Sequence, residues 1–232
     1  MPPVSALVFD IFGTLVDWRT SIAREVRAAL GDTVDAEAFA DAWRDQYQPA
    51  MEDVRSGRLP FSKLDVLHRR NLDVVLRELG LEAALDEAAK VALNLAWHRL
   101  DAWPDVAAGL VRLRTRFRIA PCSNGNISLM VDLARRNAFP WDAITGAELA
   151  RDYKPKPVVY LSAAAAFDCA PGETMMVAAH SSDLAAAAAA GLRTAFIARP
   201  DEHGPGRGES VASVPVDLSA ASVVELAQRL GC

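Results

Sequence analysis

The chain has 232 residues, of which 51% are apolar, and a formal net charge of -5. This length and apolar content suffice for one large domain, or for a core with a smaller inserted domain. The mild negative charge and the lack of a long basic block argue against nucleic acid as the main partner, although an anionic substrate stays compatible if positive charge is gathered locally.

The first apolar run covers residues 6–9 and breaks into a polar turn at Gly13. Such a run is typical of a buried strand in a parallel sheet, so Asp10 is expected at the carboxyl end of that strand. Open α/β sheets bind their ligands at this end. We therefore take Asp10 as the candidate nucleophile, with the hydroxyl group of Thr14 close to it.

Residues 20–100 carry no convincing strand signal. Apolar residues at helical spacing, ended by glycine or proline, predict four helices in this block. They are expected at residues 20–30, about 35–47 with a stop near residue 49, 61–79, and 83–100, with a loop at 55–60. We interpret residues 18–100 as a helical bundle inserted between the first strand and the rest of the chain.

From residue 101 onward, strands and helices alternate, which is typical of a doubly wound parallel sheet. The strands are expected at residues 117–122, 141–145, 174–179 and 193–198. The helices are expected at residues 104–114, 129–136, 154–167, the alanine-rich stretch before residue 191, and 219–230. Residues 201–214 are rich in glycine, proline and charge and predict a surface loop. This pattern predicts an α/β fold whose core domain comprises residues 1–17 and 101–232.

The cysteines Cys122, Cys169 and Cys232 follow no metal-binding spacing and are odd in number, which argues against a disulfide framework. They fit a reducing cytosol. The N-terminus lacks a basic segment and apolar signal core, and no apolar run is long enough to span a bilayer. We therefore expect a cytoplasmic protein that does not enter a membrane.

Polar residues follow the predicted strands at four places, namely Asp10, Ser123 with Asn124, Lys154, and Asp183. In a doubly wound sheet these strand ends converge on one cleft. A carboxylate, small hydrogen-bond donors, a cation and a second carboxylate are suited to covalent catalysis through an aspartyl ester. In that chemistry the first carboxylate attacks, the lysine balances its charge, and water later opens the ester.

Four short motifs carry a family resemblance: DIFGT at 10–14, SNG at 123–125, YKP at 153–155 and SD at 182–183. In order and spacing they resemble the four motifs of the haloacid dehalogenase-like superfamily. The resemblance covers nearly the whole chain. It implies a Rossmann-like core with an inserted helical cap, an active site between the two, and a homodimer.

Phe12 distinguishes two branches of that superfamily. Its magnesium-dependent phosphatases carry a second aspartate at this position, which protonates the leaving group, whereas a halide leaves without a proton. The sequence therefore resembles a type II 2-haloacid dehalogenase, which hydrolyses a 2-haloalkanoic acid to the 2-hydroxy acid and halide without a metal or other cofactor. The alternative is a phosphatase that has lost or relocated its acid, with magnesium held by Asp10 and Asp183.

The resemblance also assigns roles to residues that bind the substrate. Arg44, in the cap, matches the arginine that receives the departing halide. Thr14 and Asn124 match positions that orient the nucleophile and contact halide or substrate, and Ser123 matches a serine that binds the substrate carboxylate. Phe12 is expected to line the pocket and help to exclude water.

Four further residues belong to the expected site: Lys154, Asp183 and His180 as catalytic residues, and Tyr160 as a residue that contacts substrate or halide. Lys154 matches the lysine that pairs with the nucleophile, Tyr160 matches a tyrosine near the site, and Asp183 matches the acid that helps to activate the hydrolytic water. The chain departs from the pattern at His180, since the best-studied dehalogenases carry serine and asparagine in this segment. A histidine there could orient or deprotonate water, or help to hold halide.

Plainer interpretations stay open for several of these residues. Arg44 could lie on a solvated helix face, and Lys156 competes with Lys154 for the role of the paired lysine. Ser123 and Asn124 could simply form a turn, and Tyr160 could serve packing. A fold that acts as a binding module without turnover is a third functional class.

Overall fold

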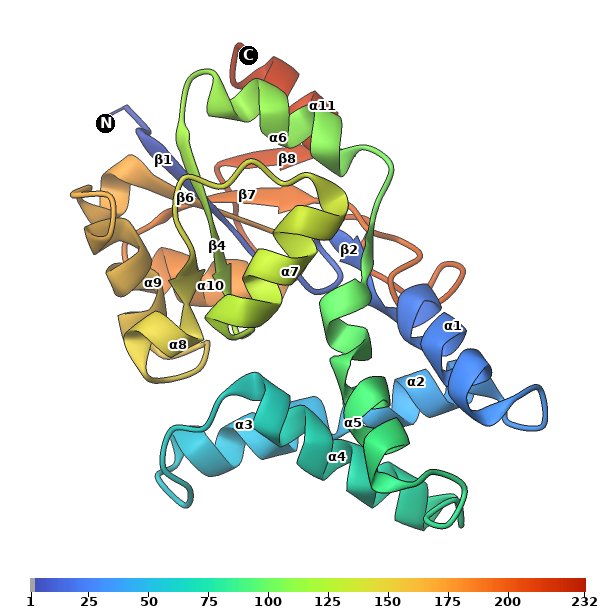
Figure 1. Ribbon diagram of the computed structural model, residues 1–232. Helices are drawn as coiled ribbons and strands as arrows, with labels where there is room; N and C mark the ends of the chain where they lie inside the picture. Colours follow the sequence, from blue (N-terminus) through green and yellow to red (C-terminus); the bar gives the residue numbers. More distant parts are fainter. Residues whose placement is uncertain (1–2) are drawn as a thin grey trace.

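The computed structural model describes residues 3–232. A sheet with helices on both faces forms one part of the molecule, and a second group of helices lies beside it (Figure 1). The strands are β1 (Ala6–Phe9), β2 (Val16–Asp17), β3 (Asp101–Ala102), β4 (Arg118–Ser123), β5 (Thr145–Gly146), β6 (Thr174–Ala178), β7 (Arg193–Ile197) and β8 (Leu218–Ala220).

The helices fall into the same two groups. Those of the second group, coloured blue to green in Figure 1, are α1 (Trp18–Leu30), α2 (Ala36–Asp45), α3 (Tyr47–Arg55), α4 (Leu64–Glu78), α5 (Glu87–Asn94) and the 3-10 helix η1 (Leu95–Arg99). The others are α6 (Val106–Arg114), α7 (Ile127–Asn137), α8 (Ala147–Ala150), α9 (Pro157–Ala165), the 3-10 helix η2 (Pro171–Glu173), α10 (Ser181–Ala189) and α11 (Val223–Arg229).

The main sheet has the strand order β5-β4-β1-β6-β7-β8, and every neighbouring pair runs parallel. From β1 the chain moves to one side through β4 and β5, then returns to the other side through β6. The carboxyl end of β1 therefore lies where the strand order reverses, which is where open α/β sheets bind ligands. The predicted doubly wound, Rossmann-like α/β fold is confirmed.

Successive residues of β1 face opposite sides of the sheet, as the geometry of a strand requires. Leu7 and Phe9 belong to the hydrophobic cluster that contains α6, α7 and α11. Ala6 and Val8 belong to the cluster formed with α9 and α10. Because both faces are covered, the strand is apolar at every position, which explains the uninterrupted run in the sequence.

After β2 the chain leaves the part that contains the main sheet and forms the second group of helices, and it returns at β3. These two strands pair antiparallel, with Val16 opposite Ala102 and Asp17 opposite Asp101. The Asp17 side chain accepts a hydrogen bond from the Thr20 backbone N–H at 3.0 Å and so caps the start of α1. Within residues 20–100 the structure contains helices, turns and loops, as the missing strand signal predicted.

Several expected boundaries were wrong. The helix expected to stop near Pro49 ends at Asp45, and α3 starts at Tyr47 and runs through Pro49, because proline is tolerated in a first helical turn. Of the strand expected at 141–145, residue 145 alone pairs; the Asp142 carboxylate instead accepts from the Ile119 N–H at 2.9 Å. The last helix starts at Val223, since the preceding residues form the edge strand β8.

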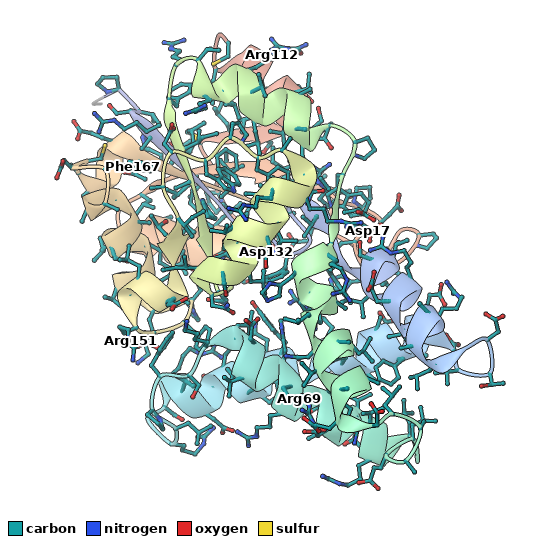
Figure 2. All side chains as sticks on the ribbon, viewed as in Figure 1. Asp17, Arg69, Arg112, Asp132, Arg151 and Phe167 are labelled. Carbon is teal, nitrogen blue, oxygen red and sulfur yellow. The ribbon has the colours of Figure 1, made fainter. Side chains whose placement is uncertain are left out.

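Side chains connect the second group of helices to the core (Figure 2). Asp132, labelled on α7, lies 2.7 Å from Nδ1 of His98, and Nε2 of the same ring lies 3.0 Å from Asp65 on α4. His98 therefore bridges the two parts of the molecule. None of the helices within residues 3–232 is long and apolar enough to cross a membrane.

Candidate active site

Asp10 follows β1 directly, and its backbone N–H donates to the Val177 carbonyl at 2.9 Å. Of its two carboxylate oxygens, Oδ1 accepts from Lys154 Nζ at 2.8 Å and Oδ2 accepts from Thr14 Oγ1 at 2.7 Å. The side chain is 8% exposed. These contacts therefore replace most of the water that would otherwise solvate the carboxylate.

Lys154 joins Asp10 to a second carboxylate. Its Nζ donates to Asp183 Oδ2 at 2.5 Å, and the Tyr160 hydroxyl donates to Asp183 Oδ1 at 2.6 Å. Burial alone would lower the pKa of Lys154, but Asp10 and Asp183 raise it well above its usual value. Burial would also raise the pKa of Asp10, but Lys154 and His180 bring it below its usual range. Both Asp10 and Lys154 are therefore charged at neutral pH.

His180 lies between two carboxylates, with Nδ1 3.1 Å from Asp10 Oδ2 and Nε2 2.8 Å from Glu202 Oε2. Burial lowers the pKa of an imidazole, but the hydrogen bonds with Asp10 and Glu202 raise the pKa of His180 to about 10. The ring is therefore a cation at neutral pH, with a proton on each nitrogen. It has no free nitrogen with which to accept a proton while Asp10 is ionised.

Glu202 corrects the expectation of a solvated surface loop at residues 201–214. Its side chain is 2% exposed, and Oε1 accepts a hydrogen bond from Trp18 Nε1 at 3.1 Å. Burial raises the pKa of a carboxyl group, but the hydrogen bond and charge of His180 lower the pKa of Glu202. Glu202 is therefore a buried anion that belongs to the site.

A cavity of about 610 Å³ opens beside these groups, between the strand ends and the second group of helices. Its lining contains most of the predicted site residues together with several that were not predicted. It is formed by Asp10, Phe12, Arg44, Asp45, Tyr47, Gln48, Arg55, Asn124, Lys154, Pro155, Tyr160, His180, Ser182, Asp183, Glu202 and His203.

Two predicted residues, Thr14 and Ser123, are fully buried behind that lining. Thr14 contacts Asp10, as described above. The Ser123 hydroxyl accepts a hydrogen bond from the Gly125 N–H at 3.1 Å, the contact of a turn former. Asn124 does line the cavity, and its Oδ1 accepts from the Lys154 backbone N–H at 2.9 Å, which fixes the loop that carries the lysine.

Arg44 reaches the cavity from α2. Its guanidinium carbon lies 4.1 Å from the ring centroid of Tyr47, 5.3 Å from that of Trp18 and 5.7 Å from that of Phe12. Aromatic faces stabilise a cation in this position. Among the described residues, the buried Nη1 of Arg44 has no hydrogen-bond partner. Arg44 therefore presents an unused, buried donor to an anion.

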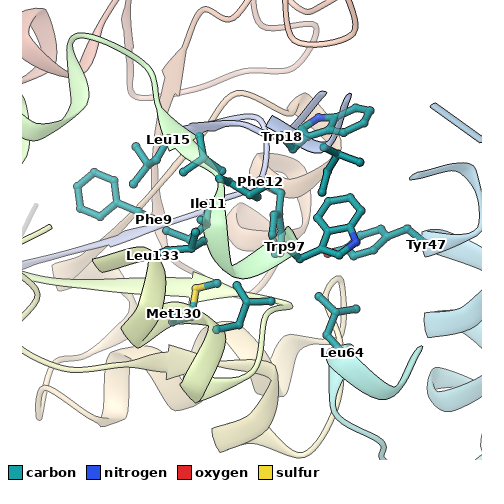
Figure 3. Packing of buried hydrophobic residues seen from close by; sticks show 14 of the residues in the cluster. Phe9, Ile11, Phe12, Leu15, Trp18, Tyr47, Leu64, Trp97, Met130 and Leu133 are labelled. Atoms are coloured by element: carbon teal, nitrogen blue, oxygen red, sulfur yellow. The ribbon is translucent and has the colours of Figure 1, made fainter. Parts of the chain in front are cut away.

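Phe12 forms the apolar side of the same space (Figure 3). It is 2% exposed and packs edge-on against Tyr47 and Trp97, with centroid distances of 6.2 and 5.9 Å. Figure 3 shows these rings gathered between the start of the chain and the second group of helices. Phe12 is thus part of an aromatic cluster beside the cavity.

Several residues of the site carry no recognisable signal in the sequence, among them Tyr47, Arg55 and Glu202. Arg55 was expected in a loop, but it ends α3 and donates from Nη1 to the Lys154 carbonyl oxygen at 2.8 Å. Its partner lies 99 residues away, and no local pattern marks such a contact. Tyr47 lies three positions after Arg44, but the break between α2 and α3 separates the two, so their contact depends on the tertiary structure.

The site offers few free oxygen ligands to a magnesium ion. All four carboxylate oxygens of Asp10 and Asp183 already accept hydrogen bonds from Lys154, Thr14, Tyr160 or His180. Among residues 3–232 no group of three or more histidine, cysteine or acidic side chains could hold a metal ion. Since Mg²⁺ requires oxygen ligands in near-octahedral geometry, this arrangement does not fit it.

Comparisons with known proteins define the class. Residues 4–191 match the model of the haloacid dehalogenase-like hydrolases, and the chain belongs to this family. The (S)-2-haloacid dehalogenase 1 of Pseudomonas sp. (strain CBS-3) is 30% identical over 210 residues, which cover 88% of this chain and 89% of the relative.

Two solved structures are similar over nearly the whole chain. The crystal structure of a defluorinating L-2-haloacid dehalogenase is 46% identical, with a TM-score of 0.95, and the match covers 99% of this chain and 96% of that one. A second L-2-haloacid dehalogenase is 45% identical, with a TM-score of 0.93 and coverage of 98% and 100%. These matches favour the dehalogenase interpretation over the phosphatase one.

Proposed function

We propose that this protein hydrolyses a 2-haloalkanoic acid to the 2-hydroxy acid and halide through an ester on Asp10. The observation that carries the proposal is the buried, ionised Asp10 carboxylate, held by Lys154 in a cavity that also contains the free donor of Arg44. The named activities of the relatives support the same substrate class.

In the first step, a carboxylate oxygen of Asp10 attacks C2 from the side opposite the halogen. Lys154 keeps Asp10 ionised, and the Thr14 hydroxyl fixes the orientation of the carboxylate. Because the Asp10 side chain is 8% exposed, the anion is less hydrated and more reactive. The halide departs toward Arg44, whose charge and free Nη1 stabilise it, while Phe12 provides an apolar surface beside it.

In the second step, water attacks the carbonyl carbon of the Asp10 ester, which regenerates the carboxylate and inverts C2 overall. Asp183 helps to orient that water, and Tyr160 and Lys154 hold Asp183 in place. Asn124 lines the cavity where the substrate carboxylate would lie, and Ser123 supports the turn that carries it.

The division into a core and a cap belongs to this proposal. Residues 18–100 act as the cap, and residues 1–17 and 101–232 act as the core. Two features support it: the β2–β3 pair at the crossing points, and a cavity lined by α2 and α3 on one side and strand ends on the other. The contact of Arg55 with the Lys154 carbonyl holds the two sides together.

Halide release tests the function directly. We expect the purified protein to release halide from 2-chloropropionate in the presence of a metal chelator, and not to release phosphate from a generic phosphate ester with magnesium. Asp10→Asn should abolish halide release while it keeps the size of the side chain. Magnesium-dependent phosphate release, without halide release, would refute the proposal in favour of the phosphatase.

Water labelled with heavy oxygen tests whether the reaction passes through an ester on Asp10. In a single turnover with excess enzyme, the label should enter Asp10 and not the hydroxy acid, because water attacks the carboxylate carbon. Label in the product would mean that water attacks C2 directly, and the proposed intermediate would then be wrong. A racemic substrate and its separate enantiomers, read by the same assay, define the stereochemical preference.

We also propose a cytoplasmic homodimer that uses no cofactor. The three cysteines are free, in keeping with a reducing compartment. Sedimentation of the purified protein measures the oligomeric state, and a monomer at micromolar concentration would contradict the dimer.

A further inference from the structure

Glu202 connects three separate parts of the chain at the active site. Its Oε2 lies 2.8 Å from His180 Nε2, and its Oε1 accepts from Trp18 Nε1. A Cβ atom at Gly13 would lie 2.0 Å from Oε1, so the turn after Asp10 packs directly against this carboxylate. A buried anion with this many specific contacts has a fixed position.

The other side of His180 faces the nucleophile, since Nδ1 is 3.1 Å from Asp10 Oδ2. Glu202, His180 and Asp10 thus form a continuous row of hydrogen-bonded groups. A carboxylate that holds one imidazole nitrogen sets the tautomer and strengthens the base at the other nitrogen. In this row His180 has the position of a general base next to Asp10, and Glu202 has the position of the carboxylate that orients it.

Asp183 is less available for proton transfer from water. One of its oxygens accepts from Tyr160 at 2.6 Å and the other from Lys154 at 2.5 Å. Each oxygen therefore already accepts one hydrogen bond, and the Lys154 ammonium lies against the same carboxylate. The His180 ring, in contrast, is 25% exposed and lines the cavity.

We propose that His180 is the base that deprotonates the hydrolytic water, that Glu202 positions it for this step, and that ester formation on Asp10 switches the pair on. This rests on the proposed dehalogenase function. While Asp10 is ionised, it holds the Nδ1 proton and His180 is inactive as a base. Once Asp10 is esterified, that charge is lost and the proton can leave.

The proton balance is complete without another reactant. Ester formation joins an Asp10 oxygen to C2 as the carbon–halogen bond breaks, and the halide leaves with its electron pair. His180 then releases its Nδ1 proton through the cavity. As water bonds to the Asp10 carbonyl carbon, Nδ1 takes one of its protons and passes it to the alkoxide when the ester bond breaks.

The last transfer restores the resting state. The new Asp10 carboxyl group gives its proton to Nδ1, which returns the carboxylate and the imidazolium. One water is consumed, and one halide and one proton are released for each hydroxy acid. Glu202 keeps its charge throughout and stabilises the imidazolium at each stage when it forms.

The Glu202→Gln variant tests the proposal, because it should slow hydrolysis of the ester and leave its formation unchanged. Rapid mixing with excess 2-chloropropionate should give a burst of about one halide per active site, followed by turnover slowed about 10²-fold or more, the usual contribution of general base catalysis. Mass spectrometry should find the ester accumulated on the Asp10 peptide. Glu209→Gln is the matched control, because Glu209 lies in the same loop and bonds the Ser181 N–H at 3.0 Å; it should behave as the wild type.

A purely structural role for Glu202 would slow ester formation as well, with no burst and no accumulated ester, and that result would overturn the proposal. So would unchanged turnover in the variant. If Glu202→Gln does not fold, His180→Gln serves instead and should show the same burst and ester. Failure of the wild type to release halide would refute the proposed function itself, which the burst assay detects separately.

Discussion

Replacing Lys154 with methionine should destabilise the protein by about 3–5 kcal/mol at pH 7. The lysine Nζ lies between Asp10 and Asp183, at 2.8 and 2.5 Å from their oxygens, and all three side chains are 10% exposed or less. At an effective dielectric constant of about 20, a pair of unit charges about 4 Å apart attracts by about 4 kcal/mol. Removing one partner of a buried pair leaves the other charge uncompensated, at a cost of about 3–5 kcal/mol.

The loss should depend on pH in a defined direction. In the wild type the pKa of Asp10 lies below its unfolded value of about 3.9, so its stabilisation is present above that value and is lost as pH falls further. Burial raises the pKa of Asp10, and Lys154 and His180 lower it. Without Lys154, only His180 offsets the effect of burial, so the pKa of Asp10 rises. The stability difference between the two proteins should therefore be largest at neutral pH and shrink toward pH 4.

Urea denaturation of both proteins at pH 7 and pH 5 measures this difference. Lys156→Met is the matched control, because Lys156 is 44% exposed and lies 3.8 Å from Asp152, so its loss should cost less than about 1 kcal/mol. A Lys154→Met variant that loses less than about 1 kcal/mol, or the same amount at both pH values, would contradict the electrostatic reasoning. Halide release should be lost at both pH values.

Three further changes probe other parts of the molecule. Gly13→Ala should slow turnover and destabilise the fold by about 1–3 kcal/mol, because φ is +84° and the new Cβ meets Glu202; thermal unfolding and halide assays measure both effects. Arg44→Lys should lower kcat/KM for halide release about tenfold or more, since a charge-assisted hydrogen bond is worth about 1.5–3 kcal/mol; an unchanged value would exclude the proposed halide contact. Despite burial, Asp65 and Asp132 raise the pKa of His98 above 6.5. The stability difference between wild type and His98→Gln should therefore be greatest below about pH 6 and decline as pH rises through the folded pKa, and a difference that grows with pH would contradict this assignment.

The sheet and its order of elements followed from local signals. The largely apolar runs that became β1, β6 and β7 have four or five residues and are followed by turn residues, which is typical of strands buried on both faces. The edge strands β5 and β8 have two and three residues, and their pairing depends on neighbours far away in the sequence. The strand expected at 141–145 overlaps β5 at residue 145 alone, and the residues of β8 were assigned mostly to the final helix, because such short patterns do not define a strand.

The residues of the site also differ in whether local signals or long-range contacts place them. Asp10 follows β1, Asp183 lies in the first turn of α10, and Lys154 lies in the loop before α9, so motif order and sheet topology were enough to bring them together. Ser123 was expected to bind substrate; in the structure its hydroxyl accepts from the Gly125 N–H, and the residue lies behind the cavity lining. Glu202 was expected in solvent, because a glutamate in a loop rich in glycine and proline is usually hydrated.

The amino-acid sequence by itself determined the α/β fold, the motif order and the exchange of an acid for Phe12, because these depend on local hydrophobic pattern and residue type. The tertiary structure alone decided which charges meet. Glu202 contacts Trp18 across 184 positions of sequence, and Arg55 contacts the Lys154 loop across 99. Such contacts arise when burial removes water from groups that the fold has brought together, and no local pattern encodes that proximity.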